Sequence, residues 1–166
     1  MLTNKHINIL FNASYVYLSM SSWFARSEIA LPGFAAYFRK ATNGEREHGI
    51  KLMEYLTKRG GKVVFQNIEK PTSMEWGTPL QAMEAALKLE KSLKKSLLAL
   101  HTAAGKEGDA NLRYFLESNY LGMSVECIKE TEDLITKIKR AGDGLGTHIL
   151  DKELAARWLA TQRLIL

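Results

Sequence analysis

Apolar residues recur every three to four positions along most of this chain, which is the spacing of helices that bury one face. Prolines occur only at positions 32, 71 and 79, so only glycines interrupt the pattern after position 79. The pattern predicts five helices, over residues 3–26, 32–59, 78–105, 109–141 and 147–166. The fifth of these is strongly apolar.

The connection between the second and third helices is much longer than the others. It spans residues 61–77 and contains one short extended run, 63–65. A connection of this length returns the chain along the bundle, so that helices two and three run parallel. The sequence therefore predicts an all-α fold in a single domain over residues 1–166. We expect a four-helix bundle with a long crossover between helices two and three, plus a short fifth C-terminal helix.

Two carboxylates and one imidazole fall on faces that the periodicity predicts to be buried. Glu45 lies between Phe34 and Leu52 on the apolar stripe of the second helix, and His48 lies one turn further along. Glu90 occupies the equivalent place on the third helix. An unpaired carboxylate in a bundle core costs several kcal/mol, so these residues need a cation, a proton or a partner.

The spacing of Glu45 and His48 suits a metal site. Residues at i and i+3 present an oxygen and a nitrogen donor to one ion, and this donor set fits Fe, Mn or Zn. The alternative is that Glu45 pairs with Arg46, Lys51 or a cation of another helix, with His48 an ordinary core histidine. Periodicity alone leaves both interpretations open.

Composition narrows the class of protein. The 166 residues are 46% apolar and 25% charged, which fits a globular domain and excludes disorder as the main state. The net charge of +5 makes contact with polyanions such as nucleic acid a hypothesis, although the basic residues form no run of five. A single cysteine, Cys127, excludes an internal disulfide and a Cys-based metal cluster, so we expect a metal site built from His, Glu and Asp.

No apolar run approaches the ~20 residues of a membrane span, and the first residues lack the apolar block of a signal peptide. We therefore expect no membrane contact and a cytoplasmic location.

Several collinear blocks carry a resemblance to a known family. They are residues 12–20 (NASYVYLSM), 45–48 (EREH), 51–53 (KLM), 58–61 (KRGG), 66–71 (QNIEKP), 87–91 (LKLEK) and 96–101 (SLLALH). In order and spacing the chain resembles the animal ferritins over nearly all of residues 7–155. The resemblance implies a ferritin-like bundle, twenty-four copies of which close into a hollow shell that stores iron as a ferric mineral.

The resemblance also implies roles for the inward residues. Ferritins of the heavy type oxidise Fe(II) with dioxygen at a di-iron centre inside the bundle. By position, Glu45 would bridge both irons, and His48 and Glu90 would each hold one. Tyr17 would hydrogen-bond to the centre from outside the ligand set.

Three positions depart from that pattern. Leu10 stands where the family places a Glu of the first iron site, and Met123 and Ser124 stand where it usually carries Glu and Gln. Because fast oxidation needs two irons held in fixed geometry, we expect slow or absent ferroxidase activity. Glu126 or Glu130 would be the substitute ligands if the centre were active.

The resemblance also implies changes in the channel through which iron enters the shell and in the cavity that holds it. Among the positions that face the shell cavity in the family, Glu47 is retained, and the usually acidic or imidazole positions carry Lys40, Asn43, Gly44 and Ile50. The positions of the three-fold channel carry Tyr114 and Glu117, with Arg113 alongside and His101 nearby. Three copies of Arg113 would oppose cation entry unless each turns to a neighbouring subunit.

The last eleven residues, 156–166, depart from the polar ending of the family. An apolar helix that carries Trp158 would be expected to seal or remodel the four-fold axis. Leu10, Ile50 and Leu56 add apolar side chains at positions that the family usually keeps polar, as in a divergent or engineered subunit.

Three functions compete. The leading hypothesis is an iron-storage cage subunit with weak or absent ferroxidase activity, working alone or mixed with heavy-type ferritin subunits. The second is an active ferroxidase at the reduced di-iron site. The third is a structural cage that binds polyanions rather than iron, which the net charge, Lys40 and Arg113 motivate.

Overall fold

The computed structural model describes residues 1–162, and every element in that range is helical. Residues 163–166, the end of the predicted fifth helix, lie outside the described residues. The helices are α1 (Leu2–Phe24), α2 (Pro32–Lys58), α3 (Pro79–Lys106), α4 (Ala110–Leu116), the π-helix η1 (Glu117–Leu121), α5 (Gly122–Ala141) and α6 (Leu145–Gln162).

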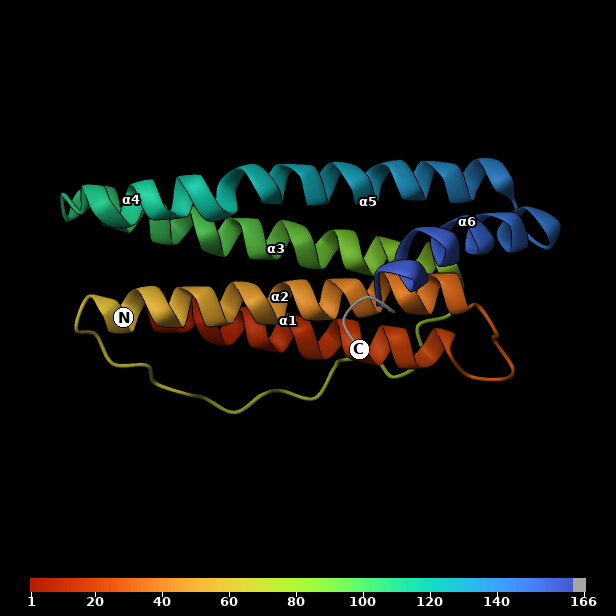
Figure 1. Ribbon diagram of the computed structural model, residues 1–166, viewed down its shortest axis with the longest axis horizontal. Coiled ribbons are helices and arrows are strands. Elements are labelled where there is room, and N and C mark those ends of the chain that lie inside the picture. The colour runs from red at the N-terminus through yellow and green to blue at the C-terminus, as the bar shows by residue number, and fades with distance from the viewer. Residues whose placement is uncertain (163–166) are drawn as a thin grey trace.

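The long helices form two antiparallel pairs (Figure 1). One pair is α1 with α2, and the other is α3 with the continuous rod made by α4, η1 and α5. The crossover runs the length of the bundle on the outside, so that α2 and α3 run parallel. The predicted bundle with a long crossover is confirmed.

The predicted fourth helix, 109–141, needs one correction. The structure interrupts it with the π-helix η1, which ends directly before Gly122. A π turn inserts extra chain into a helix and therefore rotates the faces that follow it. In this turn the Tyr120 hydroxyl donates to the backbone oxygen of His48 at 2.9 Å. The irregular turn is thus joined to the helix that carries two of the predicted site residues.

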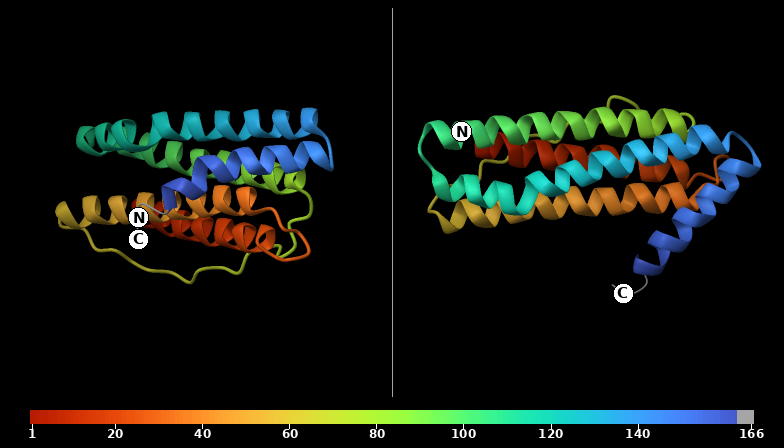
Figure 2. Two further views of the ribbon diagram at one scale, coloured as in Figure 1. Left: turned by 45° about the vertical axis from the view of Figure 1, so that its right-hand side comes forward. Right: turned by 90° about the horizontal axis from the view of Figure 1, so that it is seen from above.

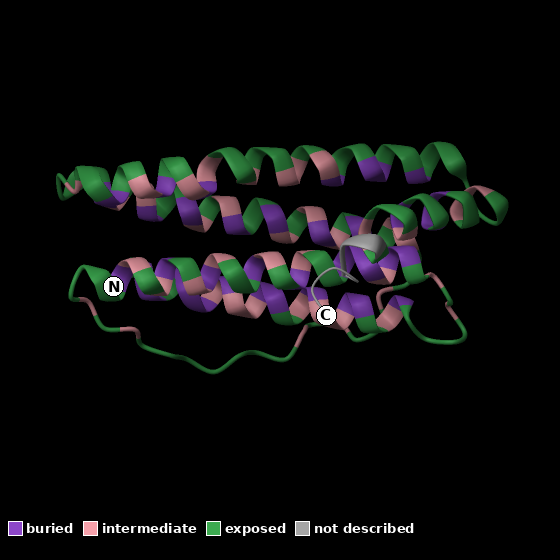
Figure 3. Ribbon diagram, viewed as in Figure 1, coloured by how far each residue is buried: buried purple, intermediate pink, exposed green. Residues whose placement is uncertain are grey.

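The interior contains two apolar clusters with polar side chains between them. One cluster centres on Phe24, Phe34 and Phe38, and the other on Ile7, Leu52, Leu97 and Leu116. On α2 and α3 the residues that separate the two clusters are Glu45 and Glu90, which are themselves buried. Figure 3 shows the buried positions along the inner faces of the helices.

Three asparagines on α1 hold the crossover. Asn4 donates to the carbonyl of Lys62 and accepts from the amide of Val64, both at 2.9 Å. One turn on, Asn8 donates to the carbonyl of Val64 and accepts from the amide of Gln66 at the same distance, and Asn12 accepts from Glu69. From Asn4 to Asn8 the helix rises about 6 Å over four residues, and from Val64 to Gln66 the extended chain advances about 6.6 Å over two, so the two segments stay in step there.

The C-terminal helix is fixed to the start of α2. The N-cap of α2, Leu31, has no side chain that could cap the helix, and Asp151 of α6 supplies the acceptor: its Oδ1 accepts from the amide of Phe34 at 3.0 Å. A Cβ on Gly33 would lie 1.8 Å from the backbone oxygen of Asp151, so only glycine permits this contact. Figure 2 shows α6 turning back at the end of α5 and slanting across the bundle.

Trp158 packs against α2 within the same chain. The ammonium nitrogen of Lys40 lies 4.0 Å from the centre of its ring, and the guanidinium carbon of Arg157 lies 4.5 Å from it. The Lys40 side chain therefore contacts α6, which the sequence did not predict.

Gly33→Ala tests the contact between α2 and α6. Overlap with Asp151 should lower the free energy of unfolding by about 2 kcal/mol and speed trypsin cleavage within α6, measured by thermal unfolding and timed digestion. Gly44→Ala is the matched control in the same helix, since its Cβ would meet nothing within 4 Å. The control should be neutral or stabilising by about 0.5–1 kcal/mol. Equal effects of the two variants would contradict the packing described here.

Candidate metal centre

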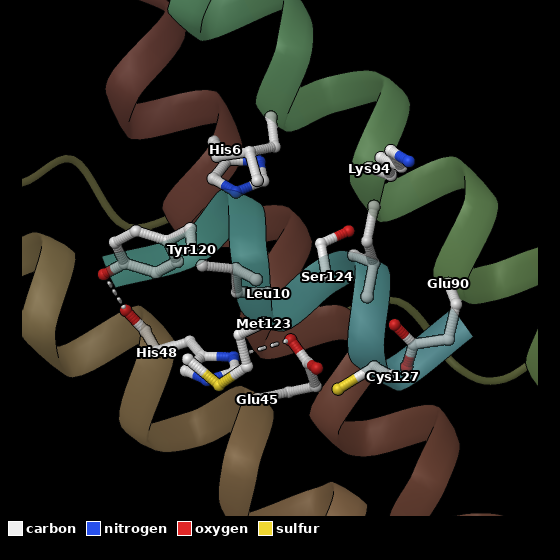
Figure 4. Close-up of a pocket in the computed structure, with 12 residues that line it drawn as sticks. His6, Leu10, Glu45, His48, Glu90, Lys94, Tyr120, Met123, Ser124 and Cys127 are labelled. Carbon is white, nitrogen blue, oxygen red and sulfur yellow. Dashed lines mark hydrogen bonds and ion pairs between the residues drawn. The ribbon is translucent and has the colours of Figure 1, made fainter. Parts of the chain in front are cut away.

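Glu45 and Glu90, which separate the two apolar clusters, line a small cavity (Figure 4). Its volume is about 40 Å³. A water molecule needs roughly 10–15 Å³ of such space, so the cavity is large enough for an ion or a few waters. Its walls are His6, Leu10, Glu45, His48, Glu90, Leu93, Lys94, Leu97, Tyr120, Met123, Ser124 and Cys127.

Glu45 and His48 come from successive turns of α2 and lie together. Glu45 is 7% exposed, and its Oε2 lies 3.5 Å from Nδ1 of His48. The pairing alternatives that the sequence offered, with Arg46 or Lys51, are not the contact found here: the neighbour of Glu45 is His48 and the partner of Arg46 is Glu47.

Glu90 enters from α3 and meets Tyr17 of α1. The Tyr17 hydroxyl donates to Oε1 of Glu90 at 2.5 Å. Burial, followed by repulsion from Glu45, raises the pKa of Glu90 to about 7, and the Tyr17 hydrogen bond acts in the opposite direction. The same burial and the nearby carboxylates raise the pKa of Tyr17 well above its ordinary value. At neutral pH the Glu90 carboxyl is therefore only partly ionised.

The three residues that depart from the family pattern, Leu10, Met123 and Ser124, all line the cavity. Leu10 is 3% exposed and presents only carbon to it. The thioether sulfur Sδ of Met123 lies 3.2 Å from Nε2 of His48, and Ser124 supplies a hydroxyl. Among the described residues, no group of three or more His, Cys, Asp or Glu side chains is arranged to hold one metal ion. Glu45, His48 and Glu90 thus share a cavity, but as they lie they do not form such a group.

Sequence reasoning missed three polar residues of the cavity wall: His6, Lys94 and Cys127. His6 is 2% exposed, its Nδ1 lies 2.9 Å from Oγ of Ser96, and burial lowers its pKa to about 4. The signal was present, because His6 precedes Leu10 by one helical turn and shares its face. Its own helix offers no other donor at ligand spacing, so the sequence alone does not assign His6 to a site.

A second cavity of about 240 Å³ adjoins the first and shares Glu45, His48, Glu90, Met123 and Cys127 with it. The proposed substitute ligands, Glu126 and Glu130, lie on its wall. Oε2 of Glu130 is 3.5 Å from Nζ of Lys40, and its Oε1 is 3.4 Å from Nη1 of Arg157. Glu130 is therefore held by two cations.

The predicted channel residues form a second cluster, between α3 and the α4–η1 rod. Nε2 of His101 lies 2.6 Å from Oε1 of Glu117, and Nη2 of Arg113 lies 3.8 Å from the same oxygen. Tyr114 is exposed. Arg113 thus has an ion-pair partner within its own chain.

The predicted cavity-facing residue Glu47 is exposed, and its Oε1 accepts from Nη1 of Arg46 at 3.3 Å. Of the neighbouring positions on the same helix, Asn43 is exposed, and Gly44 and Ile50 are half-buried.

Comparison with known proteins identifies the class to which this fold and site belong. The family described as the ferritin-like domain matches residues 2–141. The chain is 51% identical over 150 residues to a soma ferritin of Lymnaea stagnalis, covering 90% of this chain and 86% of the relative. It is 49% identical over 150 residues to a ferritin heavy chain of Echinococcus granulosus, covering 90% and 87%. A ferritin of Pacifastacus leniusculus is 47% identical over 157 residues, covering 94% and 87%. This chain belongs to the ferritin family.

None of the helices among the described residues has the length and apolar character needed to cross a membrane.

Tyr17→Phe tests the contact with Glu90. Because the Tyr17 hydrogen bond lowers the pKa of Glu90, its loss should leave that carboxyl protonated to a higher pH. The protonated carboxyl band in infrared titration reports this, with assignment by its loss in Glu90→Gln. Tyr37→Phe is the control, because Tyr37 is also buried beside the second cavity. An unchanged midpoint in Tyr17→Phe would show that the hydroxyl does not contact Glu90.

Proposed function

We propose that this chain is an iron-storage subunit of a ferritin shell whose own oxidation centre is weak or inactive. It assembles with copies of itself, and with heavy-type subunits where rapid oxidation is required. Iron is the cargo, taken up as Fe(II) and held as ferric mineral. Family membership and identity of about 50% over most of the chain support the storage role. The cytoplasmic location predicted from the sequence stays a prediction.

The proposal of a weak oxidation centre rests on the chemistry of the residues that line the cavity. Leu10 and Met123 line the same cavity as Glu45, His48 and Glu90, but bring carbon and a thioether to it instead of carboxylate oxygen. Fe(II) prefers carboxylate and imidazole ligands, so two of the expected donors are lost. Two irons held by the three remaining donors would have loose geometry, and rapid oxidation needs a fixed one.

The electrostatics of Glu45 and Glu90 also favour weak binding of Fe(II) at this centre. A divalent cation that binds Glu90 must displace a proton near neutral pH, because the pKa of that carboxyl is raised to about 7. It must also compete for Glu45 with the neighbouring His48. Both requirements weaken binding at low Fe(II) concentration.

A cation that passes the channel cluster of His101, Arg113 and Glu117 would exchange with the groups that already contact the Glu117 carboxylate. Each Glu117 carboxylate is close to both His101 and Arg113, so its charge is partly neutralised within the subunit. We propose that Fe(II) reaches the shell interior past this carboxylate more slowly than through a purely acidic channel.

The polyanion hypothesis is weakened by the same contacts. Lys40 and Arg113, the two cations that motivated it, each lie near a carboxylate of their own subunit, Glu130 and Glu117 respectively. We therefore keep iron storage as the proposed function.

Aerobic mixing with Fe(II), followed by ferric absorbance, tests the proposal. The unmodified shell should oxidise iron slowly, and Glu45→Ala with His48→Ala should change that rate little. Leu10→Glu with Met123→Glu and Ser124→Gln returns the family's donors and should raise the rate about 10- to 100-fold.

Native mass spectrometry of every variant controls for shell assembly, and iron loading in mixtures with heavy-type subunits tests the storage role separately. Fast oxidation by the unmodified shell that disappears in the Glu45→Ala, His48→Ala pair would establish the active-ferroxidase alternative instead.

A further inference from the structure

The cavity has acquired sulfur at the place where it has lost carboxylate. Sδ of Met123 lies 3.2 Å from Nε2 of His48, the imidazole nitrogen that points away from Glu45. Cys127 follows Met123 by one turn of α5 and lines both cavities with it. Figure 4 shows the Met123 sulfur against the His48 ring and the Cys127 side chain on the cavity side of α5.

The surroundings of His48 are those of a metal-binding histidine. Its Nδ1 faces the Glu45 carboxylate at 3.5 Å, which favours the tautomer with the proton on Nδ1 and the lone pair on Nε2. The Tyr120 hydroxyl fixes the backbone of the same residue at 2.9 Å. In that tautomer the free electron pair of the ring is directed at the Met123 sulfur.

A thioether is a poor ligand for Fe(II) and a good one for Cu(I), and imidazole and thiolate serve Cu(I) as well. In sites of d¹⁰ ions the metal–nitrogen and metal–sulfur bonds are about 2.0 and 2.3 Å long. An ion that bridges the two atoms at an open angle needs them about 3.5 Å apart, so a small rotation of Met123 suffices. The flexible, unbranched methionine side chain allows such a rotation.

We propose that His48, Met123 and Cys127 bind one soft monovalent cation of the Cu(I) class per subunit. The Cys127 thiol releases its proton to solvent on binding, so the cation and the thiolate neutralise each other. The group contains a thioether and is therefore distinct from one built of His, Cys, Asp and Glu alone. The inference does not depend on iron storage.

Binding of Cu(I) to the assembled full-length protein tests the site, by anaerobic competition with a chromophoric Cu(I) chelator. One ion should bind per subunit, and Met123→Leu and Cys127→Ala should each weaken binding at least tenfold. Met74→Leu is the matched control, since Met74 is an exposed methionine of the crossover, and it should leave the affinity unchanged. Ag(I), which has no redox chemistry under these conditions, should show the same order of variants.

X-ray absorption at the copper edge supplies a readout independent of affinity. The expected first shell contains two sulfur atoms and one nitrogen, and Met123→Leu should remove one sulfur. If Cys127→Ala abolishes binding while Met123→Leu and His48→Gln leave it intact, a single thiol captures the metal and the inference is wrong. Failure of iron loading together with retained Cu(I) binding would overturn the proposed function and leave this inference standing.

Discussion

Two carboxylates, Glu45 and Glu90, are buried between the two apolar clusters, and the packing of the interior has to accommodate them. Glu45 and Glu90 interrupt the apolar stripes of α2 and α3 at the same level, and so divide the core into two parts. Removing such groups from water costs several kcal/mol unless each finds a partner. Their partners come from the chain itself: His48 for Glu45, Tyr17 for Glu90. Burial, followed by the remaining repulsion from Glu45, raises the pKa of Glu90.

The rest of the fold keeps these helices in register. Asparagines on α1 bind the backbone of the crossover, and Asp151 of α6 caps the first turn of α2. The hydroxyl of Tyr120 connects the π turn to the backbone of His48. Each of these is a hydrogen bond between a side chain and the backbone of another element, which fixes one element against the next more specifically than apolar contact does.

Much of this was predictable from the sequence, for a physical reason. Helical periodicity fixes which face a residue occupies, so the burial of Glu45 and Glu90 followed from their spacing to apolar neighbours. Helix boundaries within the described residues, 1–162, followed within about two residues from prolines, glycines and caps such as Thr78. The π turn in the predicted fourth helix could not be predicted. It adds one residue to a helical turn, and no pattern of residue types indicates where that happens.

Contacts between helices were the other feature that could not be predicted from the sequence. Periodicity gives the face of His6 but not its position across the bundle, so its place in the cavity wall required the packed structure. Lys40 was interpreted from the position it shares with the family, and only the docking of α6 placed it over the Trp158 ring. The pairing of Met123 with His48 joins residues seventy-five positions apart and leaves no local signal.

The replacements at the cavity wall also have a consequence for stability. A third and fourth carboxylate beside Glu45 and Glu90 would raise the pKa of each further and would favour folding only with cations present. Leu10, which is buried, instead extends the apolar cluster around Ile7 and removes one such charge. Met123 likewise stands at the cavity wall without adding charge when no metal is bound. The wall is thus suited to a subunit that stays folded without metal, because the two acids that remain are satisfied by the side chains of Tyr17 and His48.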